Sequence, residues 1–274
     1  MGFCHFGFNF GFNSRQPAAA PAAAAAWSAT VSATARTMFL AVDDPTRVEE
    51  SSGVTKWKDV SDTDFDFSYV SGTKCTYDTT YPVNTSQKTI QNNGAAVLMQ
   101  AAAAGKSSKL WPSGVGSLYM VVYITTDMFA VGATSDGGNS VLRHGGAGSY
   151  GGVVSFYKDD AAEPANFDVR ATVYDGATKA ANDVDIPQSG NVPGWHLLSI
   201  RSTGSAIKLQ VDDRTEISTA SGAMAYLDGV LQIFNAYNAL PTTALALVAA
   251  YSTAHDDTAR DARKAEIRSC IADI

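Results

Sequence analysis

Short runs of β-branched and aromatic residues recur along the chain from residue 38 onward. The clearest runs cover residues 38–42, 96–99, 118–124 and 153–157. Clusters rich in Gly, Asn and Asp lie between them, as at residues 136–139, 145–148 and 175–176. Such runs between turn-forming clusters are typical of β-strands. Because no helical pattern alternates with the runs, the sequence predicts an all-β protein, an antiparallel two-sheet jelly-roll sandwich.

Residues 167–174 alternate between apolar and polar side chains. The apolar positions are Phe167, Val169, Ala171 and Val173. A period of two is that of a strand with one buried and one wet face. This segment therefore predicts a half-buried strand of the sandwich.

The C-terminal residues follow a different period. Asp256 and Asp257 can cap a helix, after which apolar side chains recur at three- and four-residue spacing as far as residue 274. The stripe consists of Ala259, Ala262, Ile267, Cys270, Ile271 and Ile274. We expect one amphipathic helix packed on the sandwich, with Cys270 on its buried face as a core side chain rather than a reactive thiol.

The first thirteen residues contain the tetrapeptide Phe-Gly-Phe-Asn twice, so that Phe recurs at every second position. An extended backbone would place one row of rings on a single face. Residues 14–26 are rich in Ala, and two prolines interrupt what would otherwise form a helix. The chain therefore divides into an extended arm (1–13), a Pro/Ala-rich linker (14–26) and a globular body (27–274).

Composition excludes several classes of protein. The 274 residues are 45% hydrophobic, enough for one substantial core, and the net charge of −7 leaves no basic surface for nucleic acid or anionic lipid. No uncharged apolar run approaches the roughly 18 residues that span a bilayer, so we expect no membrane association. Three widely spaced cysteines form neither a disulfide framework nor a metal knuckle, which favours a reducing place of synthesis such as a cytoplasm.

Four segments, taken in order, carry a resemblance to a known family. Residues 39–45 are followed at 54–61 by a Trp-x-Asp-x-Ser turn, residues 195–201 precede a strand that ends at 211–213, and residues 245–251 lead into the C-terminal helix. Together they resemble the concanavalin A-like lectin/glucanase superfamily, in particular the laminin-G-like domains common in phage and bacterial surface proteins. The resemblance covers residues 37–274 and implies a jelly-roll sandwich. Asp213 stands where that family has a Gly after Val-Asp.

No catalytic constellation is visible in the sequence. The glycosidases of this superfamily carry a Glu-x-Asp-x-x-Glu trio on one strand, and that trio is absent here. Asp62, Asp64 and Asp66 share a strand face but lack the Gly and distal Glu of a calcium loop, so we interpret them as a solvated edge. Residues 147–151 miss the first Gly of a nucleophile elbow, and the four histidines are scattered. We expect no enzyme activity, no cofactor and no metal.

Aromatic and acidic side chains near Gly-rich loops are candidates for a glycan site, because sugars stack on rings and hydrogen-bond to carboxylates. Core or rim packing explains most of these side chains equally well. The candidates are Trp111, Asp136, Tyr150, Tyr157 and Tyr174.

The rings of the N-terminal arm are the most unusual feature of the sequence, because each exposed ring promotes aggregation unless something covers it. Such an arm can add a strand to a partner's sheet edge or pack with copies of itself. An arm, a spacer and a lectin-like sandwich together resemble accessory proteins of tailed-phage particles, such as capsid decoration proteins, head fibres and tail fibres. We therefore expect a homo-oligomeric virion structural protein, made in the host cytoplasm. Its anchoring residues would be Phe3, Phe6, Phe8, Phe10 and Phe12.

Two other functions stay open at this point. One is a free carbohydrate-binding lectin module, which would have no use for the arm. The other is a glycosidase with a degenerate site, against which the missing carboxylate trio counts.

Overall fold

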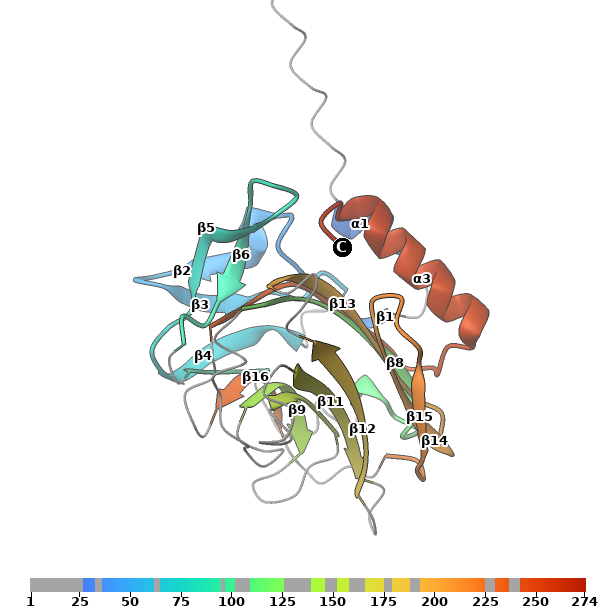
Figure 1. Ribbon diagram of the computed structural model, residues 1–274. Coiled ribbons are helices and arrows are strands. Elements are labelled where there is room, and N and C mark those ends of the chain that lie inside the picture. The colour runs from blue at the N-terminus through green and yellow to red at the C-terminus, as the bar shows by residue number, and fades with distance from the viewer. Residues whose placement is uncertain are drawn as a thin grey trace, which may run out of the picture.

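Two stacked β-sheets and a long C-terminal helix make up the body of the protein (Figure 1). The structure is a computed structural model, and it describes residues 27–32, 36–61, 65–94, 97–101, 109–125, 139–145, 152–157, 166–174, 179–187, 193–224, 230–236 and 242–274. Within these ranges all paired strands are antiparallel. The predicted two-sheet antiparallel sandwich with one C-terminal helix is confirmed.

The first sheet, called sheet A, holds eight of the described strands. From one edge to the other, its order is β15 (Ile217–Ala220), β14 (Ala206–Val211), β13 (Gly194–Ser202), β8 (Gly116–Ile124), β17 (Thr243–Tyr251), β6 (Gln87–Gln91) and β5 (Thr76–Val83). The eighth strand, β1 (Arg36–Ala41), also pairs with β17.

The second sheet, sheet B, holds nine of the described strands. Its order is β12 (Lys179–Pro187), β11 (Asn166–Tyr174), β10 (Gly152–Tyr157), β9 (Asn139–Gly145), β16 (Val230–Ala236), β7 (Val97–Ala101), β4 (Phe67–Gly72), β3 (Val54–Trp57) and β2 (Val48–Glu50). The described helices are α1 (Trp27–Thr30), the 3₁₀ turn η1 (Pro45–Arg47) and α3 (Asp257–Cys270).

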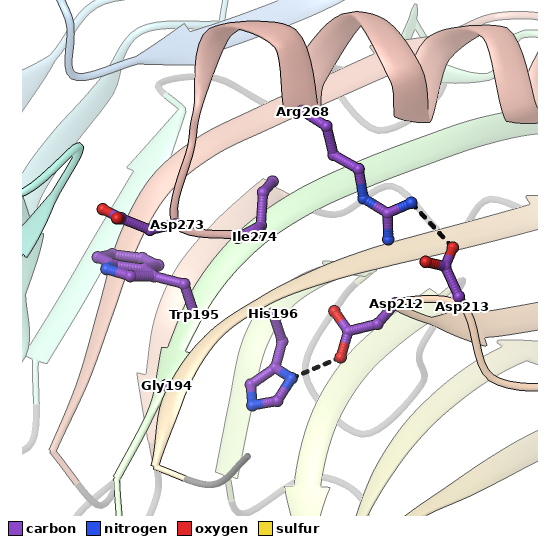
Figure 2. A pocket seen from close by; sticks show the side chains of 8 residues that line it. All are labelled: Gly194, Trp195, His196, Asp212, Asp213, Arg268, Asp273 and Ile274. Carbon is purple, nitrogen blue, oxygen red and sulfur yellow. Dashed lines mark hydrogen bonds and ion pairs between the residues drawn. The ribbon is translucent and has the colours of Figure 1, made fainter.

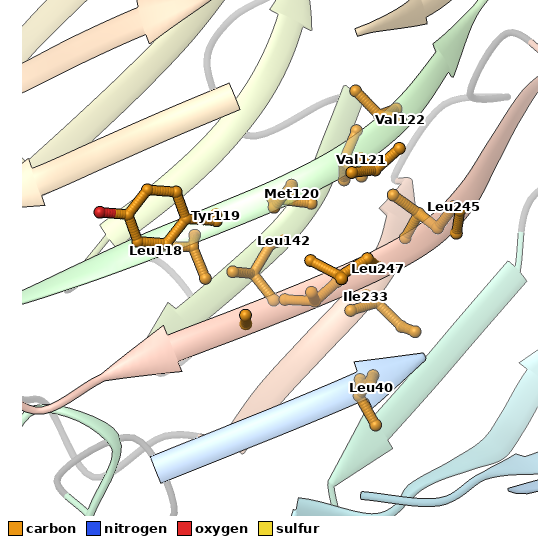
Figure 3. Packing of buried hydrophobic residues seen from close by; sticks show 14 of the residues in the cluster. Leu40, Leu118, Tyr119, Met120, Val121, Val122, Leu142, Ile233, Leu245 and Leu247 are labelled. Carbon is orange, nitrogen blue, oxygen red and sulfur yellow. The ribbon is translucent and has the colours of Figure 1, made fainter. Parts of the chain in front are cut away.

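The core lies between the two sheets. Residues of β8 and β17 that face inward meet side chains of sheet B such as Leu142 and Ile233, and all of these are buried (Figure 3). The middle strands of sheet A are also covered on their outer face, where α3 lies (Figure 1). Hence β13 and β17 are buried over almost their whole length instead of alternating between buried and exposed positions. Continuous apolar runs are the sequence pattern of strands covered on both faces.

The apolar runs at 38–42, 96–99, 118–124 and 153–157 fall on β1, β7, β8 and β10, and the alternating segment falls on β11. Other strands carry weaker signals. Strand β12 contains Asn182 and Asp183, which favour turns, and β5 contains Pro82. These strands form because neighbouring strands supply their hydrogen bonds. The conformational preferences of their own residues do not contain that information.

Helix α3 begins where the sequence predicts, because the side chain of Asp256 accepts a hydrogen bond from the backbone N–H of Ala259 at 2.7 Å. It ends at Cys270, with Ile271 as its C-cap, and so does not reach residue 274. The predicted apolar stripe is only partly correct, since Ile267 and Ile271 are buried whereas Ala262 is exposed.

A charged side chain occupies the helix face at the place where the prediction expected apolar residues. Lys264 is 4% exposed. Cys270 is half-buried at the edge of the core, so its expected role as a core side chain holds in part.

The short helix α1 joins the N-terminal side of the body to α3. Trp27 is buried and donates its Nε1–H to Gln87 at 2.9 Å, and the N–H of Ser32 donates to Glu266 of α3, also at 2.9 Å. The proposed arm and linker, residues 1–26, lie outside the described residues. None of the described helices is long and apolar enough to cross a membrane.

Candidate functional site

A pocket of about 540 Å³ opens between the C-terminal end of α3 and the ends of β13 and β14 (Figure 2). Charged and aromatic side chains from three separate parts of the chain meet there. The lining residues are Gly194, Trp195, His196, Asp212, Asp213, Arg268, Asp273 and Ile274.

The turn after β14 forms one wall of the pocket. The N–H of Arg214 donates to the carbonyl of Val211 at 3.0 Å, which closes the turn over Asp212 and Asp213. Asp212 takes the left-handed conformation, with a φ of 52°, whereas Asp213 does not. Asp tolerates that conformation better than most residues other than Gly. The turn therefore needs no Gly at position 213, and the departure from the family pattern at Asp213 is compatible with a tight turn.

Asp212 accepts two hydrogen bonds from β13. Its carboxylate lies 2.9 Å from the N–H of Leu197 and 2.7 Å from Nδ1 of His196. His196 is 2% exposed, and its Nε2 is buried with no hydrogen-bond partner among the described residues. The pair fixes the orientation of the imidazole and ties the turn to the neighbouring strand.

Two cations of α3 hold the other carboxylate of the turn. Arg268 donates to Asp213 at 2.8 Å, as Figure 2 shows, and Lys264 reaches the same carboxylate at 3.3 Å. Lys264 also donates to Gln210 at 2.8 Å and to the carbonyl of Asp212 at 2.5 Å. The hydrogen bond from Arg268 lowers the pKa of Asp213. Burial lowers the pKa of Lys264, and its hydrogen bond to Asp213 acts in the opposite direction.

Aromatic rings border the pocket on the opposite side. Trp195 donates its Nε1–H to the carbonyl of Pro82 in β5 at 2.7 Å, and its ring meets Tyr123 edge-on, with 5.3 Å between centroids. Tyr123 in turn stacks on Tyr81 at 4.6 Å. Burial raises the pKa of Tyr123. These contacts cover much of each ring, so the aromatic side chains act first as packing between β5, β8 and β13.

The pocket presents charged and aromatic side chains that can recognise a ligand. Its lining contains no Ser, Thr or Cys side chain that could act as a nucleophile. Asp212 and Asp213 are already bonded to His196, Lys264 and Arg268. Within the described ranges, no group of three His, Cys, Asp or Glu residues is placed to share a metal ion.

Of the predicted glycan candidates, Trp111, Tyr157 and Tyr174 are described, and none of these three lines this pocket. Trp111 is 4% exposed, and its indole packs so closely on Gly116 that a Cβ would not fit there. Tyr157 and Tyr174 lie in sheet B, towards opposite ends of the β10–β11 pair. Asp136 and Tyr150 lie outside the described residues, so the glycan assignment stays a prediction.

The anchoring residues and the acidic cluster are described only in part. Phe3, Phe6, Phe8, Phe10 and Phe12 precede the first described residue, and Asp62 and Asp64 lie in the gap between residues 61 and 65, so all of them are outside the described residues. Asp66 accepts a hydrogen bond from the N–H of Asp59 at 2.8 Å, which gives it a role in the turn after β3.

Sequence reasoning missed His196, Lys264 and Arg268 as partners of the 212–213 turn. These residues lie 16 to 55 positions from the turn residues that they contact, so no local spacing joins them. The sequence offered one signal for these partners, the Asp-Asp pair at positions 212 and 213. Two adjacent carboxylates after a buried strand are stabilised by cations nearby, so the pair predicts basic side chains close to the turn.

Neither a family model nor a curated protein sequence matches this chain. Solved structures do match its fold. The binding domain of botulinum neurotoxin serotype D/C superposes with a TM-score of 0.57 over 85% of this chain and 53% of that domain, at 7% identity. The serotype D binding domain gives a TM-score of 0.55 over 88% and 53%, at 11% identity.

A third structure is that of a complex. It is the botulinum neurotoxin DC binding domain in complex with rat synaptotagmin II, with a TM-score of 0.53 over 85% of this chain and 52% of that chain, at 7% identity. The chain thus spans about half the length of the domains it resembles. At such low identity the likeness shows the fold, an all-β jelly-roll-like sandwich that also occurs in receptor-binding domains.

Proposed function

We propose that this protein is a non-enzymatic binding module that recognises a receptor or glycan through the surface of its sandwich. The observation that carries the proposal is the fold match over 85% of the chain to domains whose names describe binding. The pocket supports it, because ion pairs and hydrogen bonds hold the carboxylates of Asp212 and Asp213 in fixed positions in its lining. Fold alone does not select a ligand, so the ligand must be found by experiment.

The test is a binding assay on the full chain against immobilised capsular and cell-wall polysaccharides and intact bacterial cells. We expect saturable binding to at least one of them. Tyr157→Ala and Tyr174→Ala test the predicted glycan residues, and loss of a sugar-stacking ring should weaken binding about tenfold, which corresponds to about 1.4 kcal/mol. Val70→Ser is the matched control, because Val70 is a 48% exposed side chain elsewhere on sheet B.

Two results would contradict the proposal. Absence of saturable binding to every polysaccharide and cell surface would remove the binding function. Binding that both tyrosine variants retain would move the glycan site away from sheet B.

We further propose that the module is a virion structural protein, attached to its particle through residues 1–13 and forming a homo-oligomer. The alternating Phe residues of the arm favour this function over a free lectin, since a free lectin gains nothing from an exposed row of rings. Deletion of residues 1–13 should leave the body folded, because the described body has its own buried core, and should abolish attachment.

Co-sedimentation with purified particles measures the attachment, and circular dichroism of the truncated protein checks the fold. A full-length variant with Phe6, Phe8, Phe10 and Phe12 all changed to Ser keeps the arm but removes its rings. Stoichiometric co-sedimentation of either altered protein would overturn the anchoring role.

A further inference from the structure

Helix α3 is fastened to sheet A mainly by charged and polar side chains. At its N-terminal end, Arg201 of β13, which is 1% exposed, donates to Asp257 at 2.7 Å and to the carbonyl of His255 at 2.8 Å. The same guanidinium pairs with Glu216, which also receives Arg260 of α3 at 3.1 Å. This end of the helix therefore rests on a network of two arginines and two carboxylates.

The C-terminal half of the helix is held in a similar way. Lys264 and Arg268 reach the 212–213 turn, and the carbonyl of Cys270 accepts from Asn84 at 3.0 Å. Among the described residues of the helix and its C-cap, the buried apolar side chains are those of Ile267 and Ile271. Because these two side chains are the buried apolar ones of the described helix and its C-cap, attachment of the helix depends strongly on its ion pairs and hydrogen bonds.

His255 lies under the start of the helix, in the connection from β17. Its Nδ1 and the hydroxyl of Tyr119 are 2.8 Å apart and share a hydrogen bond, and its ring lies 4.6 Å from that of Tyr251. The backbone N–H of His255 donates to Ser117 at 2.8 Å. The imidazole thus links β8, β17 and the start of α3 at one point.

The charges around His255 come from every element packed against it. Arg263 of α3 and Arg201 of β13 are cations that act on its imidazole, with Asp256 as the opposing carboxylate. Tyr119 and Tyr251 are also titratable, but burial raises the pKa of both phenols and keeps them neutral. Further charged groups of these elements are Arg36, Glu216, Asp257, Arg260 and Glu266.

We infer that α3 is a pH-sensitive cover, closed over the outer face of sheet A at neutral pH and released when protonation of His255 adds a cation beside Arg201 and Arg263. Release would expose Tyr119, Tyr251 and Ser199, each at most 1% exposed in the closed state. The inference concerns the helix alone and does not depend on which ligand the module binds.

The direction of the effect follows from the environment of the imidazole. Burial, followed by the charges of Arg263 and Arg201, lowers the pKa of His255 below its ordinary 6.5. The imidazole has the lowered pKa in the closed state and its ordinary pKa of 6.5 once the helix is released. Above pH 6.5 it is neutral in both the closed and the released state, and the closed state keeps its full stability. That stabilisation is lost as the pH falls below 6.5 towards the lowered value.

The carboxylates of the same contacts respond at lower pH. The hydrogen bond from Arg201 lowers the pKa of Asp257 below 3.8, and the hydrogen bond from Arg268 does so for Asp213. The ion pairs of Asp257 and Asp213 therefore persist while His255 is titrating. Opening between pH 6.5 and 4.5 reports the histidine, and any opening below about pH 4 reports the carboxylates.

Hydrogen–deuterium exchange of the full-length protein between pH 7.5 and 4.5 tests the inference, after correction for the intrinsic pH dependence of exchange. We expect amides of α3 to lose at least tenfold in protection over this range, while amides of β8 stay protected. His255→Gln keeps a neutral partner for Tyr119 and should abolish the pH dependence. Arg263→Met should reduce it, because removal of one cation lets the pKa of His255 rise towards 6.5.

Asp261→Asn is the control on the same helix, since Asp261 pairs with Arg260 at the exposed surface, and it should behave as wild type. Protection of α3 that stays constant from pH 7.5 to 4.5 would overturn the inference. An equal loss of α3 protection in His255→Gln would also overturn it. So would a simultaneous loss of amide protection in α3 and β8, because that indicates global unfolding.

Discussion

Trp195 connects three strands through one side chain. It is 9% exposed, bonded to the carbonyl of Pro82 in β5 and in edge contact with Tyr123 of β8. Trp195→Ala should lower the free energy of unfolding by about 3–5 kcal/mol, because it leaves a cavity in addition to losing the transfer free energy of the indole. Chemical denaturation measures the change.

Trp195→Phe separates packing from hydrogen bonding. It keeps most of the ring but removes the Nε1–H donor, so it should cost less than the Ala variant and still leave the Pro82 carbonyl without its partner, at about 1–3 kcal/mol. A melting temperature of Trp195→Ala within about two degrees of wild type would show that the ring contributes little to the core.

The cysteines differ in accessibility. Cys75 is fully buried, and burial raises the pKa of its thiol to about 12, so it is neutral and shielded. Cys270 is half-buried at the end of α3. In a Cys4→Ser background, a thiol reagent at pH 8 should modify Cys270 and should reach Cys75 only after denaturation. Rapid modification of both thiols in the native protein would contradict this assignment.

At the scale of elements, the turn after β14 holds two carboxylates, Asp212 and Asp213, that we expect to contribute unequally to the stability of the fold. Asp212→Ala leaves the N–H of Leu197 and the buried Nδ1 of His196 without an acceptor, so we expect a loss of about 1–3 kcal/mol in stability. The side chain of Asp213 is 77% exposed, and Asp213→Ala should cost under about 1 kcal/mol. Urea denaturation of both variants makes the comparison, and equal losses would contradict it.

The elements that could be predicted from the sequence are those whose signal is local. Strands β8 and β17 are nearly continuous apolar runs, and Asp256 marks the start of α3. Strand β12 could not be predicted, since its Asn and Asp residues form a strand only beside β11. Lys264 could not be placed either, because the carbonyl and amide that receive its amine lie over fifty residues away.

The candidate site was less predictable than the fold for the same reason. Its walls come from β13, from the 212–213 turn and from the residues around the end of α3, and only the folded chain brings these together. The resemblance to laminin-G-like sandwiches pointed to several strands and to the turn, but it could not supply Lys264 and Arg268, which bond to Asp213 of that turn.

At the scale of the whole molecule, we expect no hydrolysis of any glycan. Both glycosidase mechanisms need two opposed carboxyl groups that are free to act, whereas Asp212 and Asp213 are each bonded to residues of the protein. Incubation with capsular and cell-wall polysaccharides, read out as release of reducing ends, tests this expectation. Turnover that disappears when one Asp or Glu is changed to its amide would establish an enzyme instead.

The central position of β17 also bears on how the protein is made. This strand, residues 243–251, pairs with β8 on one side and with β1 and β6 on the other, yet it is synthesised after all of them. A growing chain therefore displays apolar strands whose common neighbour is still missing, and pairings this distant in sequence form slowly. Sheet A can close only after residue 251 has emerged from the ribosome, so we expect the nascent chain to depend on chaperones up to that point.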